Sequence, residues 1–115
     1  MDIRQQTSGD VAVVELSGRL TINDQPGMLK EAVAKAVANG ARHVLLDLHG
    51  VRYIDSTRLG EIIASHITVS RQGGRLKLVA IPERIVELLQ IAGLDGVFER
   101  YDTADAARAS LAQTS

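Results

Sequence analysis

The chain predicts a single α/β domain over residues 1–115, in which a mostly parallel sheet carries an antiparallel edge strand. Its length of 115 residues suits one hydrophobic core. Strand-like and helix-like apolar periods alternate along it in the order β-β-α-β-α-β-α-β-α. Helix-length crossovers between consecutive strands imply parallel pairing with right-handed connections.

Four of the predicted strands are short runs rich in apolar residues, and a fifth, residues 2–6, is predicted as a short edge that pairs across a turn. They are residues 2–6, 11–16, 43–48, 75–80 and 97–101. The first two are joined across the "TSGD" turn, so the first becomes an edge strand, and an exposed edge can pair with a second copy to form a homodimer. Glu15, Asp47 and Lys77 interrupt the inner strands, whereas a sheet covered on both faces usually reads as an unbroken apolar run. We therefore expect helices mainly on one face and a partly wet opposite face.

The predicted helices each carry apolar residues at spacings of three and four. These stripes run from Leu29 to Val37, from Leu59 to Ile67 and from Ile85 to Ala92, and an Ala-rich helix follows Thr103 to about Leu111. Before the first stripe, "INDQPG" is a helix-start signal in which Asn23 or Asp24 can cap. His66 falls on the apolar side of its helix, which favours a packed role for its ring.

Composition excludes several classes of protein. A net charge of −1 argues against a nucleic-acid binder, which would show a basic stripe. The absence of cysteine excludes disulfides and thiolate metal sites, and the sequence indicates no cofactor. No apolar run approaches the length of a membrane span, so we expect a cytoplasmic protein.

The pattern of polar residues also argues against an enzyme. A serine nucleophile needs a neighbouring base and an oxyanion hole, and Ser56 lies in no G-x-S-x-G elbow. His43, His49 and His66 are scattered, and nothing in the sequence ties them to Ser56. Phosphate-binding loops, H-E-x-x-H motifs and paired carboxylates are also missing.

The stretch "YIDSTRLGEII", residues 53–63, joins a strand to a helix through Asp55-Ser56-Thr57. One interpretation is structural, because Asp55 or Ser56 can cap the helix by accepting a bond from a free backbone N–H. Capping needs only one such residue, and here three stand in a row at the positive end of a helix dipole. The second interpretation is that Ser56 accepts a phosphate, which the helix end tolerates.

The stretch "VLLDLHGVRYIDSTRLGEI" resembles the signature of STAS domains, specifically of anti-sigma factor antagonists, in which Asp-Ser-Ser/Thr-Gly-Leu-Gly opens the second main helix. The resemblance extends to "VAVVELSGRLT", which is similar to the second strand and Gly-Glu-Leu-Asp turn of the family. It also includes "GRLKLVAIPERIVELLQIAGLDGVFERYDTADAA", similar to its C-terminal half.

The resemblance implies a regulatory cycle. Ser56 corresponds to the serine that an ATP-binding anti-sigma serine kinase, with a fold like that of histidine kinases, phosphorylates in the family, and Asp55 and Thr57 flank it. The unphosphorylated form binds the kinase and so frees a sigma factor. Phosphorylation blocks that binding, and a serine phosphatase reverses it.

Three positions depart from the family pattern. Arg58 stands where the family has glycine, and Arg19 and Thr21 replace the glutamate and aspartate of the turn. We expect Arg19, Thr21, Arg58 and Leu59 to form the surface that binds the partner. Either the partner has acidic groups opposite Arg19 and Arg58, or the domain has left the kinase cycle; Arg58 is also placed to pair with a phosphate on Ser56. A solvated surface position is the simpler interpretation of both arginines.

Two other functions stay open on the sequence. One is a STAS subunit of a larger assembly, such as a stressosome-like scaffold or a lipid-transport complex, without a phosphorylation switch. The other is nucleotide sensing, although no glycine-rich phosphate cradle is present.

Overall fold

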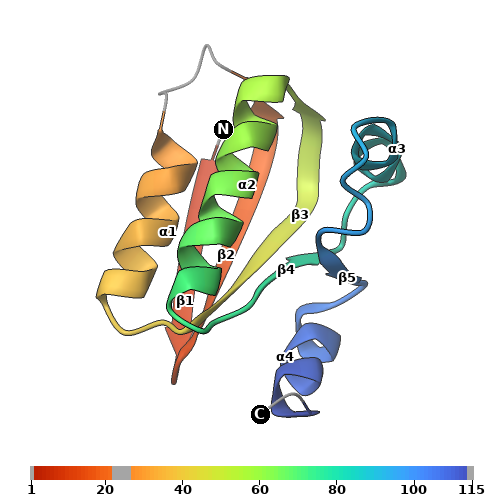
Figure 1. Cartoon of the computed structure of the whole chain (residues 1–115). Coiled ribbons are helices and arrows are strands. Elements are labelled where there is room, and N and C mark those ends of the chain that lie inside the picture. Colours follow the sequence, from red (N-terminus) through yellow and green to blue (C-terminus); the bar gives the residue numbers. More distant parts are fainter. Residues whose placement is uncertain (1, 22–26, 114–115) are drawn as a thin grey trace.

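A computed structural model describes residues 2–21 and 27–113 (Figure 1). Within these residues the strands form one sheet in the order β1-β2-β3-β4-β5, with β1 antiparallel to β2 and the other neighbours parallel. The strands are β1 (Asp2–Ser8), β2 (Val11–Leu20), β3 (His43–Ile54), β4 (Leu76–Val79) and β5 (Glu99–Tyr101). The helices are α1 (Met28–Ala38), α2 (Ser56–Arg71), α3 (Glu83–Ile91) and α4 (Ala104–Gln113). The predicted fold class and element order are confirmed.

Strands β2 and β3 run further than their apolar cores predicted. The predicted strands ended at Leu16 and Leu48, but the observed pair continues to Leu20 and Ile54 through register shifts near Ser17 and Gly18. Gly50 makes the continuation fit, because a Cβ at this position would lie 2.8 Å from the Cβ of Ser17. The extension brings Arg19 beside Tyr53 and delivers the chain directly to Asp55.

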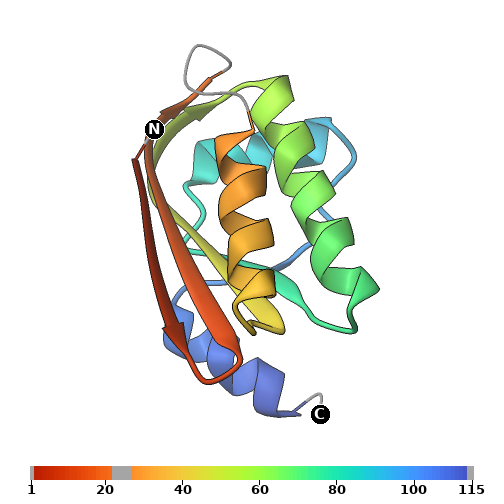
Figure 2. The same cartoon turned by 90° about the vertical axis from the view of Figure 1, so that its left-hand side faces the viewer.

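The sheet has a well-covered face and a lightly covered face. Helices α1 and α2 lie side by side on the first (Figure 2), and their apolar side chains join those of α3 and the sheet in one large core cluster. On the opposite face α4 contributes Ala107 and Leu111 to a small cluster with Val13, Leu45 and Val79. The prediction of helices mainly on one face is therefore confirmed.

The prediction of a partly wet opposite face is confirmed in β2 and β3 and is wrong in β4. Glu15 is exposed and Asp47 is partly exposed, but Lys77 has no exposed surface. The reason is that α4 covers the β4 end of this face, and Ser110 of α4 accepts a hydrogen bond from Lys77 Nζ at 2.6 Å.

Helix α1 begins later than its predicted start signal. Its N-cap is Gly27, which contributes no side-chain hydrogen bond. The predicted caps Asn23 and Asp24 lie outside the described residues. The amide groups of the first turn of α1 therefore need another acceptor.

Candidate functional site

The site is centred on the junction between β3 and α2, at the top of Figure 1. Asp55 is the N-cap of α2, and its Oδ1 accepts a hydrogen bond from the backbone N–H of Arg58 at 2.8 Å. The predicted cap is thus supplied by Asp55. The backbone N–H of Asp55 in turn donates to the carbonyl oxygen of Leu20 at 3.0 Å, which ties the start of α2 to the end of β2.

Ser56 and Thr57 are the first two residues of α2, and both are exposed. Because Asp55 already caps the helix, the Ser56 hydroxyl is not required for that purpose. Ser56 is thus an exposed residue at the positive end of a helix of 16 residues. An anion added there would meet the helix dipole favourably.

Arg58 does not lie where the sequence placed it. Its side chain is 0% exposed, so the prediction that it belongs to an exposed docking surface is wrong. Its Nε donates to the carbonyl oxygen of Thr21 at 3.2 Å, and its Nη1 pairs with Glu61 Oε1 at 2.6 Å. The guanidinium is buried because an acceptor just after β2 and an acceptor from its own helix replace the water that it gives up.

Glu61 extends this contact to a third element. Its Oε2 accepts a hydrogen bond from the backbone N–H of Lys30 at 3.1 Å, in the first turn of α1. The sequence analysis missed Glu61. Its position three residues after Arg58 was the available signal, because residues three apart are neighbours on a helix surface.

Arg19 and Thr21 lie beside the junction, as predicted. The guanidinium carbon of Arg19 is 4.7 Å from the centre of the Tyr53 ring, a cation–π contact between neighbouring strands. Arg19 is exposed and Thr21 is half-buried, with its carbonyl oxygen directed to Arg58. Leu59, also predicted to contact the partner, is mostly buried but forms part of a wall of the groove described next.

A groove of about 520 Å³ lies between the start of α2 and α3. Its apolar wall includes Tyr53, Leu59, Leu88 and Ile91, and Ser56 lies on its edge. Ile91 is 85% exposed, far more than is usual for a large aliphatic side chain. The sequence analysis missed the groove. Ile91 was a visible signal, because it is apolar but is not one of the residues of the predicted stripe, which are Ile85, Leu88, Leu89 and Ala92.

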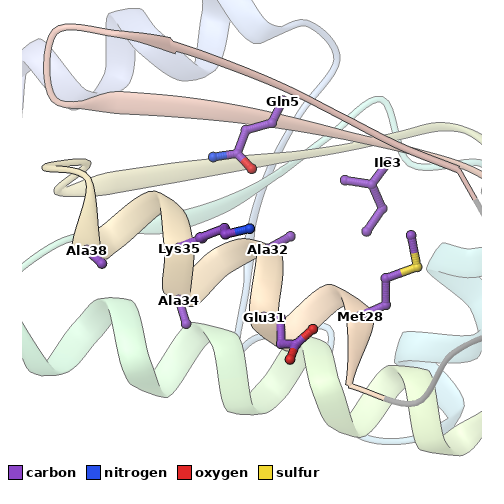
Figure 3. Close-up of a pocket in the computed structure, with 8 residues that line it drawn as sticks. All are labelled: Ile3, Gln5, Met28, Glu31, Ala32, Ala34, Lys35 and Ala38. Carbon is purple, nitrogen blue, oxygen red and sulfur yellow. The ribbon is translucent and has the colours of Figure 1, made fainter.

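A second hollow lies between β1 and α1, away from Ser56. Figure 3 shows Ile3 and Gln5 of β1 pointing toward α1, and Met28 and Ala32 pointing back. Its lining combines apolar side chains with the charged groups of Glu31 and Lys35.

The three histidines take separate positions. His43 Nδ1 accepts a hydrogen bond from the backbone N–H of Arg75 at 3.0 Å, and His49 Nδ1 lies 3.3 Å from Asp47 Oδ1. The ring of His66 packs edge-on against Phe98, with a centroid distance of 5.2 Å, as its place on the apolar side of the helix predicted. Within residues 2–21 and 27–113, no group of three or more His, Asp or Glu side chains is arranged to hold a metal ion.

Similarity to known proteins agrees with this geometry. The family model described as "Mlab, STAS domain" matches residues 3–99. The anti-sigma-B factor antagonist of Bacillus subtilis is 32% identical over 95 residues, which cover 83% of this chain and 84% of that protein. The solved structure of the Thermotoga maritima protein TM1081 has a TM-score of 0.85 at 27% identity, covering 94% of this chain and 92% of that one.

A more distant neighbour shares the fold alone. The Bacillus cell fate determinant SpoIIAA, solved in its phosphorylated form, has a TM-score of 0.75 at 17% identity and covers 96% of this chain and 99% of that chain.

The fold and these matches define a STAS domain. Within that class, the chain belongs to the anti-sigma factor antagonist family. Members of this family are regulatory proteins that act without catalysing a reaction, so the chain is not assigned an enzymatic activity. Among the described residues, no helix has the length and apolar character needed to span a membrane.

Proposed function

We propose that this protein is a switchable binding module: it binds an anti-sigma serine kinase, and phosphorylation of Ser56 releases it. The observation that carries the proposal is the exposed Ser56 at the tip of α2, on the edge of the apolar groove formed with α3. A modified hydroxyl at this position changes the docking surface while the core of the domain stays as it is. A serine phosphatase would reset the switch.

The charge of a phosphate is large enough for this purpose. At about pH 7 it adds roughly −1.5 to −2 charges, and the helix end tolerates it with a gain of about 0.3–1 kcal/mol. A partner carboxylate about 4 Å away would lose on the order of 4 kcal/mol at an effective dielectric near 20. A hundredfold loss of affinity needs only about 2.7 kcal/mol, so one phosphate is sufficient to release the partner.

The docking surface has two chemically different parts. Tyr53, Leu88 and Ile91 offer apolar area that a partner side chain can cover. Arg19 and Thr21 stand in the turn where the resemblance to STAS domains leads us to expect glutamate and aspartate, so we propose that the partner faces Arg19 with an acidic group. Arg58 takes no part in this contact because it is buried.

The test is incubation of the protein with a candidate anti-sigma serine kinase and ATP, followed by mapping of the phosphate by mass spectrometry. We expect the phosphate on Ser56, and we expect Ser56→Ala to abolish it. Thr57→Ala is the matched control, since Thr57 is the next residue and is also exposed, and this change should leave phosphorylation unchanged. Label that persists at another residue in Ser56→Ala would exclude Ser56 as the acceptor.

A second candidate function is a constitutive STAS subunit of a larger assembly. The exposed Ile91 and Tyr53 favour it, because an apolar contact of this kind does not need a switch to form. Pull-down and size-exclusion experiments with Ser56→Asp separate the two functions. Binding lost in Ser56→Asp supports the switch, and binding indifferent to it, but lost in Ile91→Asp, supports the constitutive subunit.

A further inference from the structure

We infer that Arg58 is a positioning residue, which holds the end of β2 and the start of α1 against the first turn of α2. The inference rests on the proposed function, because these elements carry the phosphate acceptor Ser56 and the docking residues Arg19 and Thr21. Its physical basis is a continuous set of hydrogen bonds that a glycine at position 58 would not make.

The guanidinium group joins two elements directly. Its Nε donates to the carbonyl oxygen of Thr21 at 3.2 Å, and its Nη1 donates to Glu61 Oε1 at 2.6 Å. The side chain of Arg58 has no exposed surface, and that of Glu61 is only 11% exposed. A charge-assisted hydrogen bond between two buried side chains is strong. It also fixes the relative orientation of the two groups, because the guanidinium donors point in fixed directions.

Glu61 connects a third element by capping α1. Its second oxygen accepts a hydrogen bond from the backbone N–H of Lys30 at 3.1 Å. That amide belongs to the first turn of α1, where Gly27 at the N-cap supplies no side-chain acceptor. The missing cap of α1 is thus provided by a residue of α2, and Arg58 fixes the orientation of that residue.

The backbone next to Ser56 takes part in the same network. The N–H of Asp55 donates to the carbonyl oxygen of Leu20, and the N–H of Arg58 donates to Asp55 Oδ1. Residues on both sides of Ser56 are therefore bonded to residues 20 and 21. The turn that carries Arg19 and Thr21 is held in register with the serine before any partner arrives.

These hydrogen bonds also determine whether Arg58 can neutralise a phosphate on Ser56. The sequence allowed Arg58 to pair with a phosphate on Ser56, but the guanidinium is turned inward to Thr21 and Glu61. A phosphate on the exposed hydroxyl therefore keeps its charge toward solvent, where a partner meets it. Arg58 therefore positions the backbone around Ser56 without neutralising the charge of a phosphate on it.

The experiment is residue-resolved amide hydrogen exchange of the full chain and its variants. Glu61→Gln keeps an acceptor for Arg58 but replaces the oxygen that accepts from the Lys30 N–H with an NH₂ group. Arg58→Lys keeps the charge but loses the planar guanidinium that donates to Thr21 and Glu61 together. We expect the Lys30 amide to exchange about tenfold faster or more in both variants, beyond any change at Leu78 in β4, a strand that is paired on both sides. Leu78 reports global unfolding, so the excess at Lys30 measures local release of the start of α1.

Two further variants complete the test. Glu31→Gln removes an equal charge from the first turn of α1 and should leave exchange at Lys30 unchanged. The double variant Arg58→Met with Glu61→Met leaves no unpaired buried charge, so it should fold, and it should still show fast exchange at Lys30. The inference is overturned if Lys30 and Leu78 change by the same factor, or if Lys30 stays protected in the double variant. A failure to find phosphate on Ser56 would contradict the proposed function and leave this result untouched.

Discussion

Arg58 and Lys77 are the cationic side chains without exposed surface in residues 2–21 and 27–113, and the protein buries them differently. Arg58 pairs with Glu61, whose side chain is 11% exposed, whereas Lys77 pairs with Glu99, whose side chain is 51% exposed. Lys77 Nζ also donates to Ser110 Oγ at 2.6 Å and lies 5.1 Å from the centre of the Tyr101 ring. The Arg58–Glu61 pair is enclosed by protein, whereas the carboxylate of the Lys77–Glu99 pair is in contact with water.

The difference teaches how a buried cation can serve two purposes. The planar guanidinium has several donors in fixed directions, so Arg58 aligns separate elements next to the proposed phosphate acceptor. The ammonium group is a compact charge on a flexible stem, so Lys77 attaches one helix, α4, to a lightly covered face of the sheet. The cost of removing each cation should follow the exposure of the carboxylate left behind.

Arg58→Ala should have the largest effect. It leaves Glu61 enclosed without its cation, and breaking a buried pair costs about 3–5 kcal/mol of unfolding free energy. Urea unfolding followed by circular dichroism measures this loss. The double variant Arg58→Met with Glu61→Met should lose much less, because no charge remains unpaired. An equal loss in both would show that packing, and not the pair, is what the arginine supplies.

Lys77→Met should cost much less, within about 1 kcal/mol of the wild-type stability. Glu99 is half exposed and regains water, and a methionine fills the space of the lysine stem. The same urea titration checks this value. A loss as large as that of Arg58→Ala would remove the contrast between the two cations.

Ser56→Asp should raise stability by about 0.3–1 kcal/mol at low salt, because it adds a negative charge to the positive end of α2. Ser70→Asp is the matched control, since Ser70 is exposed in the last turn of the same helix and the sign of the effect should reverse. Thermal unfolding at two salt concentrations measures both. If the guanidinium of Arg58 turned outward to the new carboxylate, the stabilisation would exceed this range and would disappear in Arg58→Met with Glu61→Met.

The smallest effect is expected for His43, on the sheet near Lys77. Burial lowers the pKa of His43 below its ordinary value of 6.5; Arg42, Lys77 and Arg75 lower it further, and Asp10 opposes them. Below about pH 6.5 the unfolded chain therefore binds more protons at His43 than the folded chain does. The contribution of neutral His43 to the unfolding free energy is fully present above this pH and is lost as the pH falls toward the pKa of the folded state. Unfolding free energies at several pH values from 7.5 downward should decline less steeply in His43→Gln. Parallel curves for the two proteins would contradict a role for His43.

Much of the candidate site was predicted from residue types and their near neighbours in the sequence. Asp55 caps α2 as its residue type and position predicted, because the bond from its side chain spans only three residues. The same local signal placed Ser56 at the start of α2, where its side chain is exposed. Arg19 and Thr21 were predicted beside it by the resemblance to STAS domains. The register of β2 with β3 places Arg19 there, and the hydrogen bond from Arg58 places Thr21 there.

Burial of the polar side chains was the part that the sequence analysis predicted wrongly. Arg58 was expected on the docking surface and Lys77 on the partly wet face of the sheet, but both are enclosed. Each has an acceptor that is remote along the chain: Thr21 is 37 residues from Arg58, and Ser110 is 33 residues from Lys77. Periodicity reports which face of an element is apolar, but it does not report which distant element will cover a given residue.

The sequence by itself determined the order of the strands and helices, the cap at Asp55 and the presence of a hydroxyl at the start of α2. These features depend on apolar spacing and on hydrogen bonds between near neighbours, which act before the chain is compact. Only the tertiary structure decided that Arg58 points inward to Glu61 and Thr21, and that Tyr53 and Ile91 share a groove with Ser56. The physical reason is that a buried charge or a groove exists only after separate elements have met, so its energy belongs to their packing.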